Sequence, residues 1–232
     1  MEAIVLAGGL GTRLRAAVPD LPKPMAPVGG RPFLEHLLGY WTGQGVARFT
    51  LSVGYRHEAI SGHFGTAFRG VPIAYAVEKR PLGTGGGLLL ATRSLSTAGP
   101  FLVLNGDTYF EVTLRMLRDS HAANRAEGTL SLFRSPQQGR YAGLQIGKAG
   151  EVLCMGAGEM GGLANGGVYL MEHGLLEGGP WRPSSPVSLE EDILPFALRS
   201  NKRVYGLECP GRFLDIGVAE DYARAAELLG VK

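Results

Sequence analysis

Apolar residues follow two different spacings along the first half of the chain. Short apolar runs, typical of buried strands, stand at residues 3–7, 49–53, 73–77 and 101–104. Between these runs, apolar residues recur at the three-to-four-residue spacing of a helix, over 32–44, 57–64, 85–93 and 114–125. This alternation of strands and helices predicts a parallel sheet that helices cover on both faces.

After Gly128 the pattern changes to short strands with turns between them. Strands are expected at 129–133, 144–146, 151–154, 168–171, 204–207 and 212–214, and helices at 189–199 and 219–229. Ser188 and Glu191 predict a capping box at the first of these helices, and Gly230 ends the second. We therefore expect a single α/β domain over 1–232, a three-layer sandwich with a Rossmann-like sheet, mostly parallel and mixed in its second half.

Composition narrows the classes of protein that remain. The 45% hydrophobic and 19% charged residues are typical of a folded chain, and a net charge of +2 speaks against a nucleic-acid or membrane-surface binder. No apolar run approaches the length of a membrane span, and the first one ends at Gly8 without a basic segment before it. Cys154 and Cys209 have no spacing of a disulfide framework or zinc site. We expect a cytoplasmic protein with two reduced, buried thiols.

The first strand leads directly into a glycine-rich loop. Gly8, Gly9 and Gly11 leave the backbone N–H groups open to a phosphate, and Arg13 adds a fork of donors. The loop lacks the Gly-Lys-Ser/Thr of a P-loop, and Leu14 replaces the third glycine of a dinucleotide fingerprint. A tight strand-to-helix turn with an exposed arginine is the open alternative.

A second motif brackets a lysine between two prolines. Pro22 and Pro24 hold the chain extended, so Lys23 presents its ammonium group from a rigid backbone. Because the motif follows the glycine loop closely, Lys23 is a candidate for a second phosphate contact.

Together, these two motifs resemble the signature of the sugar-1-phosphate nucleotidyltransferases, the nucleoside-diphosphate-sugar pyrophosphorylase family. The resemblance extends along nearly the whole chain. Residues 78–86 resemble the family's nucleobase loop, 165–169 its sugar loop, and 188–195 its late helix. Residues 105–107 and 213–217 resemble its two metal-binding segments. Among short relatives, the chain is most similar to the heptose-1-phosphate guanylyltransferases, with mannose-1-phosphate guanylyltransferases and short uridylyltransferases as alternatives.

The resemblance implies a reaction and the residues that serve it. A sugar phosphate would attack the α-phosphorus of a nucleoside triphosphate and release pyrophosphate, with Mg²⁺ as cofactor. The nucleotide-binding part would cover about 1–128, and the sugar-binding part about 129–232. The implied nucleotide contacts are Leu6, Ala7, Gly8, Gly9, Gly11, Thr12, Arg13, Lys23, Glu78, Gly83, Thr84 and Asp107. The implied catalytic residues are Arg13, Lys23 and Asp107, the metal ligands Asp107 and Asp215, and the sugar-phosphate contacts Arg140, Gly143, Asn165, Gly166 and Glu190.

The chemistry of Glu78 favours one nucleobase. A carboxylate accepts two hydrogen bonds side by side, and guanine offers N1–H and its N2 amino group in that arrangement. Uracil repels a carboxylate with its carbonyl oxygens, whereas cytosine and adenine each offer one amino group. GTP is therefore expected first and CTP next. A surface pair of Glu78 with Lys79 or Arg80 is the structural alternative.

The sequence departs from the family pattern at the sugar phosphate. Where the family carries a Glu-Lys pair, this chain has Ala157 and Gly158. We expect Arg140, or next Lys148, to replace the missing lysine. A catalytically inactive, nucleotide-sugar-binding regulatory protein is one rival. A glycosyltransferase of related fold is another, although its usual Asp-x-Asp is absent. A homo-oligomer is possible.

Overall fold

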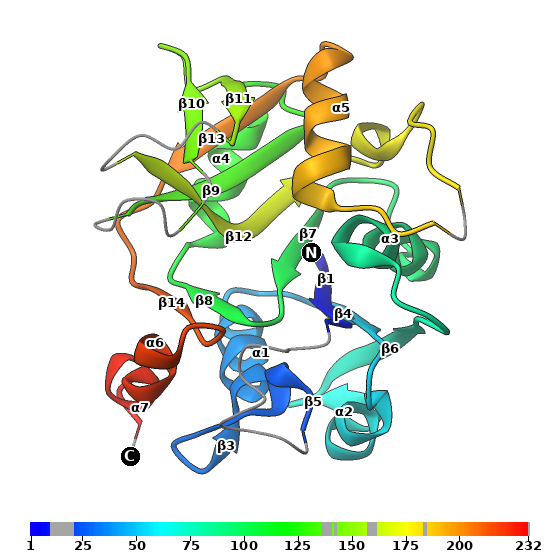
Figure 1. The fold of residues 1–232 in the computed structure, drawn as a ribbon, viewed down its shortest axis with the longest axis vertical. Helices are drawn as coiled ribbons and strands as arrows, with labels where there is room; N and C mark the ends of the chain where they lie inside the picture. Colours follow the sequence, from blue (N-terminus) through cyan, green and yellow to red (C-terminus); the bar gives the residue numbers. More distant parts are fainter. Residues whose placement is uncertain (10–20, 136–140, 142, 157–161, 183–184, 232) are drawn as a thin grey trace.

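A mixed sheet of ten strands runs through the computed structural model, which describes residues 1–9, 21–135, 141, 143–156, 162–182 and 185–231 (Figure 1). The strands are β1 (Glu2–Ala7), β4 (Arg48–Val53), β5 (Ala67–Phe68), β6 (Val71–Val77), β7 (Phe101–Asn105), β9 (Gly128–Arg134), β10 (Gly143–Ile146), β11 (Val152–Met155), β12 (Leu163–Met171) and β13 (Val204–Glu208). The order β6-β4-β1-β7 forms a parallel core. The strands predicted in the first half of the chain are confirmed.

The second half of the chain extends this sheet through β12. That strand pairs antiparallel with β7, and β9 and β10 pair antiparallel with β12. β13 closes one side parallel to β9, and β11 pairs with β10. The prediction of a mixed extension is therefore confirmed.

Helices cover both faces of the sheet. Along β1, Ala3 and Val5 belong to one apolar cluster and Ile4 to another, as expected for alternate positions of a buried strand. The first cluster includes residues of α1 (Phe33–Gly43), α2 (His57–Phe64) and α4 (Leu114–Ala123). The second includes residues of α3 (Gly83–Ala91) and α5 (Leu194–Arg199). The predicted three-layer α/β/α sandwich is confirmed.

Short elements complete the chain around this sandwich. They are η1 (Lys23–Met25), β2 (Pro27–Val28), β3 (Arg31–Pro32), η2 (Thr92–Ser94), β8 (Thr108–Phe110), η3 (His173–Leu176), β14 (Phe213–Asp215), α6 (Ala219–Ala223) and α7 (Ala225–Leu228). β14 pairs antiparallel with β8, and Asp215 stands opposite Thr108. This pairing brings a late segment of the chain next to the end of β7.

The two late helices differ from their predictions. The helix expected over 219–229 is broken into α6 and α7 at Arg224. The helix expected over 189–199 opens with a π-helical turn, η4 (Leu189–Ile193). Ser188 Oγ accepts from the N–H of Glu191 at 3.0 Å, but Asp192 Oδ2, and not Glu191, accepts from the N–H of Ser188 at 2.8 Å. The wider π turn brings the fourth residue, instead of the third, back to the cap.

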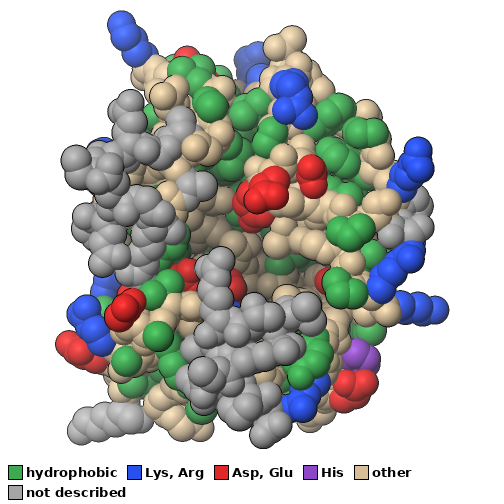
Figure 2. Space-filling model, in the orientation of Figure 1, with side chains coloured by type: hydrophobic (Ala, Val, Ile, Leu, Met, Phe, Trp, Pro, Cys, Tyr) green, Lys and Arg blue, Asp and Glu red, His purple; other side chains and the backbone are tan. Residues whose placement is uncertain are grey.

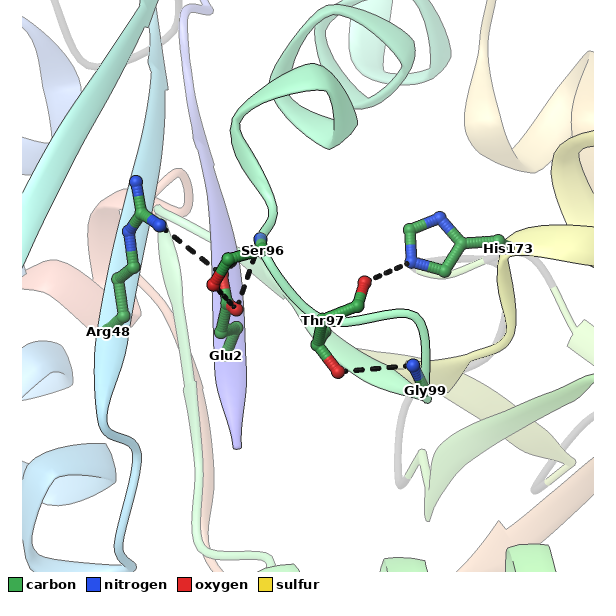
Figure 3. Close-up of polar contacts among 6 residues, drawn as sticks. All are labelled: Glu2, Arg48, Ser96, Thr97, Gly99 and His173. Atoms are coloured by element: carbon green, nitrogen blue, oxygen red, sulfur yellow. Dashed lines mark hydrogen bonds and ion pairs between the residues drawn. The ribbon is translucent and has the colours of Figure 1, made fainter.

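The amino-terminal end of β1 is held by a polar cluster (Figure 3). Glu2 accepts hydrogen bonds from the N–H of Ser96 at 3.1 and 3.2 Å, and Arg48 lies 4.0 Å away. Burial alone would raise the pKa of Glu2, but the bonds from Ser96 and the charge of Arg48 lower it overall. Since β1 runs away from this cluster, its carboxyl end lies at the opposite edge of the sheet.

Two further predictions concern the burial of the two cysteines and the length of apolar segments. Cys209 is buried as expected, but Cys154, in β11, is exposed. Both are free thiols. In the part of the chain that the structure describes, no helix has the length and apolar character to cross a bilayer.

Candidate active site

The predicted nucleotide-binding residues gather at the carboxyl ends of the parallel strands. There, Gly8 follows β1, Glu78 follows β6, and Asn105 ends β7. The strand order reverses at β1, which has β4 on one side and β7 on the other. In open α/β sheets, ligands bind in the crevice at such a point.

A cavity of about 450 Å³ occupies this edge of the sheet, within the usual range for a small-molecule site. The surface is hollowed near the centre of the face drawn in Figure 2, and acidic side chains lie beside the hollow. Nine predicted nucleotide contacts line the cavity: Leu6, Ala7, Gly8, Gly9, Lys23, Glu78, Gly83, Thr84 and Asp107. The other three, Gly11, Thr12 and Arg13, lie outside the described residues.

The carboxylate of Glu78 lies at the wall of this cavity, close to two glycines. One oxygen, Oε1, accepts from Ser52 Oγ at 3.2 Å, and the other, Oε2, accepts from the N–H of Leu82 at 3.0 Å. A Cβ at Gly87 would lie 2.8 Å from Oε1, and a Cβ at Gly8 would come closer still. The absence of side chains at both glycines therefore makes room for the carboxylate.

The surface alternative for Glu78 is wrong. Among the described ion pairs, Glu78 pairs with neither Lys79 nor Arg80, and its partners are Ser52 and the backbone of Leu82. Burial raises the pKa of Glu78, while these two hydrogen bonds oppose the shift. The half-buried acceptor faces a cavity that has room for a ligand.

A lysine and two carboxylates form a charged cluster at the site, and Lys23 and Asp107 of this cluster line the cavity. Lys23 Nζ lies 2.6 Å from Asp107 Oδ2 and 3.5 Å from Asp215 Oδ1. The side chains of Lys23, Asp107 and Asp215 are 14%, 38% and 18% exposed. Burial raises the pKa of Asp215, the charge of Lys23 opposes that shift, and the charge of Asp107 adds to it. The ammonium group therefore balances two carboxylates from segments far apart in the sequence.

The two carboxylates of this cluster are oxygen donors of the kind that Mg²⁺ binds. The carboxylate oxygens of Asp107 and Asp215 both lie close to the ammonium group of Lys23, so a positive charge is already held between them. Carboxylate oxygens are also hard ligands. The described residues contain no group of three or more Asp, Glu, His or Cys side chains placed to hold a metal ion. Water molecules, or phosphate oxygens of a bound nucleotide, would complete the coordination, as is usual for Mg²⁺.

Four of the predicted sugar-side residues, Gly143, Asn165, Gly166 and Glu190, lie on β10, β12 and η4. Asn165 Nδ2 donates to the hydroxyl of Tyr169 at 2.7 Å, and Glu190 Oε2 accepts from Thr84 Oγ1 at 2.8 Å. Gly166 is buried, and a Cβ there would collide with Phe110. These contacts join Glu190 to the nucleotide cavity, because Thr84 lines it.

The other residues predicted to serve the sugar phosphate are only partly covered by the described structure. Gly143 is buried in β10, where its carbonyl accepts from the N–H of Gly156 at 2.9 Å. Arg140 and the pattern departure at Gly158 lie outside the described residues, and Lys148 is exposed between β10 and β11. The choice of a cation for the sugar phosphate stays a prediction.

Five cavity residues were not among the predicted contacts: Pro24, Ser52, Pro81, Gly87 and Asn105. Two of them, Ser52 and Asn105, carry polar side chains. Ser52 is the next-to-last residue of β4 and bonds to Glu78. Asn105 ends β7, and its Oδ1 is buried without a hydrogen-bond partner in the described part of the chain. Asn105 could have been predicted as a cavity residue from the sequence, because it stands two residues before Asp107. Nothing in the sequence of its strand marks Ser52 as a cavity residue.

The comparison with known proteins agrees with this geometry. Residues 2–230 match the family model described as nucleotidyl transferase. The chain belongs to the nucleotidyl transferase family. It is 39% identical to D-glycero-alpha-D-manno-heptose 1-phosphate guanylyltransferase of Aneurinibacillus thermoaerophilus, over 99% of this chain and 98% of that protein. It is 31% identical to mannose-1-phosphate guanylyltransferase of Mycobacterium tuberculosis, over 97% of this chain and 64% of that protein.

A solved structure of the nucleotidyl transferase fold superposes over the same length. HddC from Yersinia pseudotuberculosis, in complex with GMP-PN, matches with a TM-score of 0.85 and 32% identity. The match covers 97% of this chain and 98% of that one. The chain therefore has the nucleotide-diphospho-sugar transferase fold over its whole sheet, and it is a sugar-1-phosphate nucleotidyltransferase by family.

Proposed function

We propose that this protein transfers GMP from GTP to a sugar 1-phosphate of the heptose or mannose type, and that it requires Mg²⁺. A sugar phosphate oxygen forms a bond to the α-phosphorus of GTP. The bond from that phosphorus to the bridging oxygen breaks, and pyrophosphate leaves. The observation that carries the proposal is the cavity itself, with an acceptor for a base at Glu78 and charged groups for phosphates at Lys23 and Asp107.

The guanine preference rests on the state of the Glu78 carboxylate. Each of its oxygens accepts one hydrogen bond from the protein and keeps a further lone pair. Guanine matches two adjacent acceptors with N1–H and its N2 amino group. The two named relatives are guanylyltransferases, which supports the same base.

The phosphates would lie at the other end of the cavity. Lys23 would leave the carboxylates for the phosphate oxygens of GTP, and Asp107 and Asp215 would hold Mg²⁺. The bound ion would supply positive charge at the phosphate oxygens, where negative charge grows during transfer. Because the Lys23 side chain is largely buried, its interaction with a phosphate is strengthened by the low local polarity.

The sugar 1-phosphate would approach from the side of β12 and η4. Asn165 and Glu190 are the polar side chains there that suit hydroxyl groups, since they offer an amide and a carboxylate. The heptose and mannose choices follow the names of the relatives. A cytoplasmic location and a homo-oligomer remain part of the proposal.

Pyrophosphate release across four nucleoside triphosphates and a panel of sugar 1-phosphates tests the function. We expect GTP to exceed UTP and ATP by at least about tenfold in kcat/KM, since a buried hydrogen-bonding site discriminates strongly against an unmatched partner. E78Q is the matched variant, and it should reduce this preference. A preference for UTP or CTP would overturn the assignment of guanine as the base. No turnover with any pair of nucleoside triphosphate and sugar 1-phosphate would favour an inactive binding protein.

A further inference from the structure

One tyrosine hydroxyl joins the sugar side of the site to its base side. Tyr169 belongs to β12, and its side chain is 0% exposed, so it touches no ligand in the cavity. Its hydroxyl accepts from Asn165 Nδ2 at 2.7 Å and donates to Glu190 Oε1 at 3.1 Å. A single hydroxyl thus holds two of the side chains proposed to meet the sugar.

The same network continues into the nucleotide cavity. Glu190 Oε2 accepts from Thr84 Oγ1 at 2.8 Å, and Thr84 Oγ1 accepts from the N–H of Leu189 at 2.8 Å. Thr84 lines the cavity at the start of α3. An unbroken series of four side chains therefore leads from Asn165 through Tyr169 and Glu190 to Thr84.

The backbone fixes both ends of this series. The pairing of β12 with β9 shifts register between Asn165 and Tyr169, which marks a bulge in the strand. Within the bulge, Gly167 has a φ of 71° and donates its N–H to Asn165 Oδ1 at 3.1 Å. Both polar atoms of the Asn165 amide are therefore engaged, and its orientation depends on Tyr169.

The hydroxyl of Tyr169 is suited to donate a hydrogen bond to Glu190, because it holds its proton strongly. Burial raises the pKa of Tyr169 well above its usual range, and the charge of Glu190 raises it further. At neutral pH the hydroxyl therefore keeps its proton and can donate it in a hydrogen bond to Glu190. Removing the hydroxyl would leave one amide donor and one carboxylate oxygen without their partner in a partly buried place, which is costly.

We infer that Tyr169 is a positioning residue that couples the sugar side of the site to the base loop through Glu190. The inference rests on the proposed function, since it takes Asn165 and Glu190 as the sugar contacts. It assigns no contact with substrate to Tyr169 itself. Because the two substrates would meet opposite ends of one hydrogen-bonded series, a change at either end alters binding at the other.

Y169F tests this inference, because it keeps the ring in the core and removes only the hydroxyl. We expect KM for the sugar 1-phosphate to rise about tenfold, as for the loss of one buried hydrogen-bonding partner, with a smaller change in kcat. Y40F is the matched control, since the Tyr40 hydroxyl bonds to the carbonyl of Val112 outside the cavity at 3.2 Å. Y40F should leave both KM values unchanged.

Coupling is measured by adding T84V to the wild type and to Y169F. In the wild type, T84V should raise KM for the sugar 1-phosphate about threefold or more, and in Y169F this added effect should vanish. An equal effect of T84V in both backgrounds would overturn the inference, as would wild-type KM values in Y169F.

A second pair of variants tests the inference in case Y169F does not fold. If urea denaturation shows that Y169F is unfolded, the cycle of T84V and N165A in the wild-type background replaces it. Coupled effects on the sugar KM support the series, and additive effects refute it. A wild type without pyrophosphate release on any substrate would refute the proposed function instead, so the two failures are distinct.

Discussion

Replacing Lys23 by methionine tests whether the two aspartates form a cation site. The substitution keeps an unbranched apolar stem and removes the ammonium group that lies 2.6 Å from Asp107 and 3.5 Å from Asp215. Removing one partner of a fully buried ion pair costs about 3–5 kcal/mol, and exposed pairs contribute about 1 kcal/mol or less. Since these side chains are only partly exposed, we expect K23M to lower the free energy of unfolding by about 2 kcal/mol.

Magnesium should reverse this loss. In K23M the two carboxylates face each other without a counter-charge, so a divalent cation should bind them better than in the wild type, where it must displace the ammonium group. A ligand at about 100 times its Kd stabilises the folded state by about 2.7 kcal/mol. Saturating Mg²⁺ should therefore restore most of the stability of K23M and change the wild type less.

Urea denaturation in EDTA and in excess Mg²⁺ measures both effects without any substrate. K202M is the matched control, because Lys202 Nζ bonds to the carbonyl of Gly174 at 2.8 Å and lies 3.5 Å from one carboxylate, that of Glu127. It should be destabilised without recovery in Mg²⁺. If K23M unfolds at the same urea concentration with and without Mg²⁺, the two-aspartate cation site is refuted, whatever the variant does to turnover.

Three further predictions concern turnover and the base. D107N and D215N should each abolish Mg²⁺-dependent pyrophosphate release, and EDTA should silence the wild type; full activity in excess EDTA contradicts the metal site. E78Q should raise the free energy of unfolding by roughly 0.5 kcal/mol or more while it weakens GTP preference. Burial raises the pKa of Glu78, so ionisation of this carboxyl group opposes folding. The gain in the free energy of unfolding of E78Q should therefore appear as pH rises above the usual pKa of a glutamate, and it should disappear below that pH. A gain that is largest at acid pH contradicts this prediction. G87A should raise KM for GTP, since its Cβ would lie 2.7 Å from Ser52 Oγ and 2.8 Å from Glu78 Oε1, and an unchanged KM would place the base elsewhere.

The sheet could be predicted from the sequence because its pattern is local. The continuous apolar run within β1 and the helical spacing within α1 are each properties of one segment, and each follows from the burial of apolar side chains away from water. The π-helical turn at η4 and the break at Arg224 were missed, since both depend on how the late helices meet the rest of the chain. Exposure of Cys154 was also missed, since it depends on which parts of the chain pack against the faces of β11.

The candidate site was predictable where it follows strand ends. Glu78 and Asp107 stand at the carboxyl ends of predicted parallel strands, which must meet at one edge. The pairing of Lys23 with Asp107, 84 residues apart, depends on the path of the chain outside those strands. Tyr169 belongs to the motif that resembles the sugar loop, but only the tertiary structure shows that its hydroxyl bonds to both Asn165 and Glu190.

The junction of β7 with β12 explains how two substrates could meet in one site. β7 ends at Asn105 and leads to Asp107, which the proposed function assigns to the phosphates. β12 pairs antiparallel with β7, with Val168 opposite Leu104, so its bulge at Asn165 reaches the same edge of the sheet. Phosphate and sugar groups bound to these two strands would therefore lie near each other without any movement of a domain. Holding both reactants on one rigid sheet reduces the entropy that their encounter costs, which is the main contribution a protein can make to phosphoryl transfer besides charge.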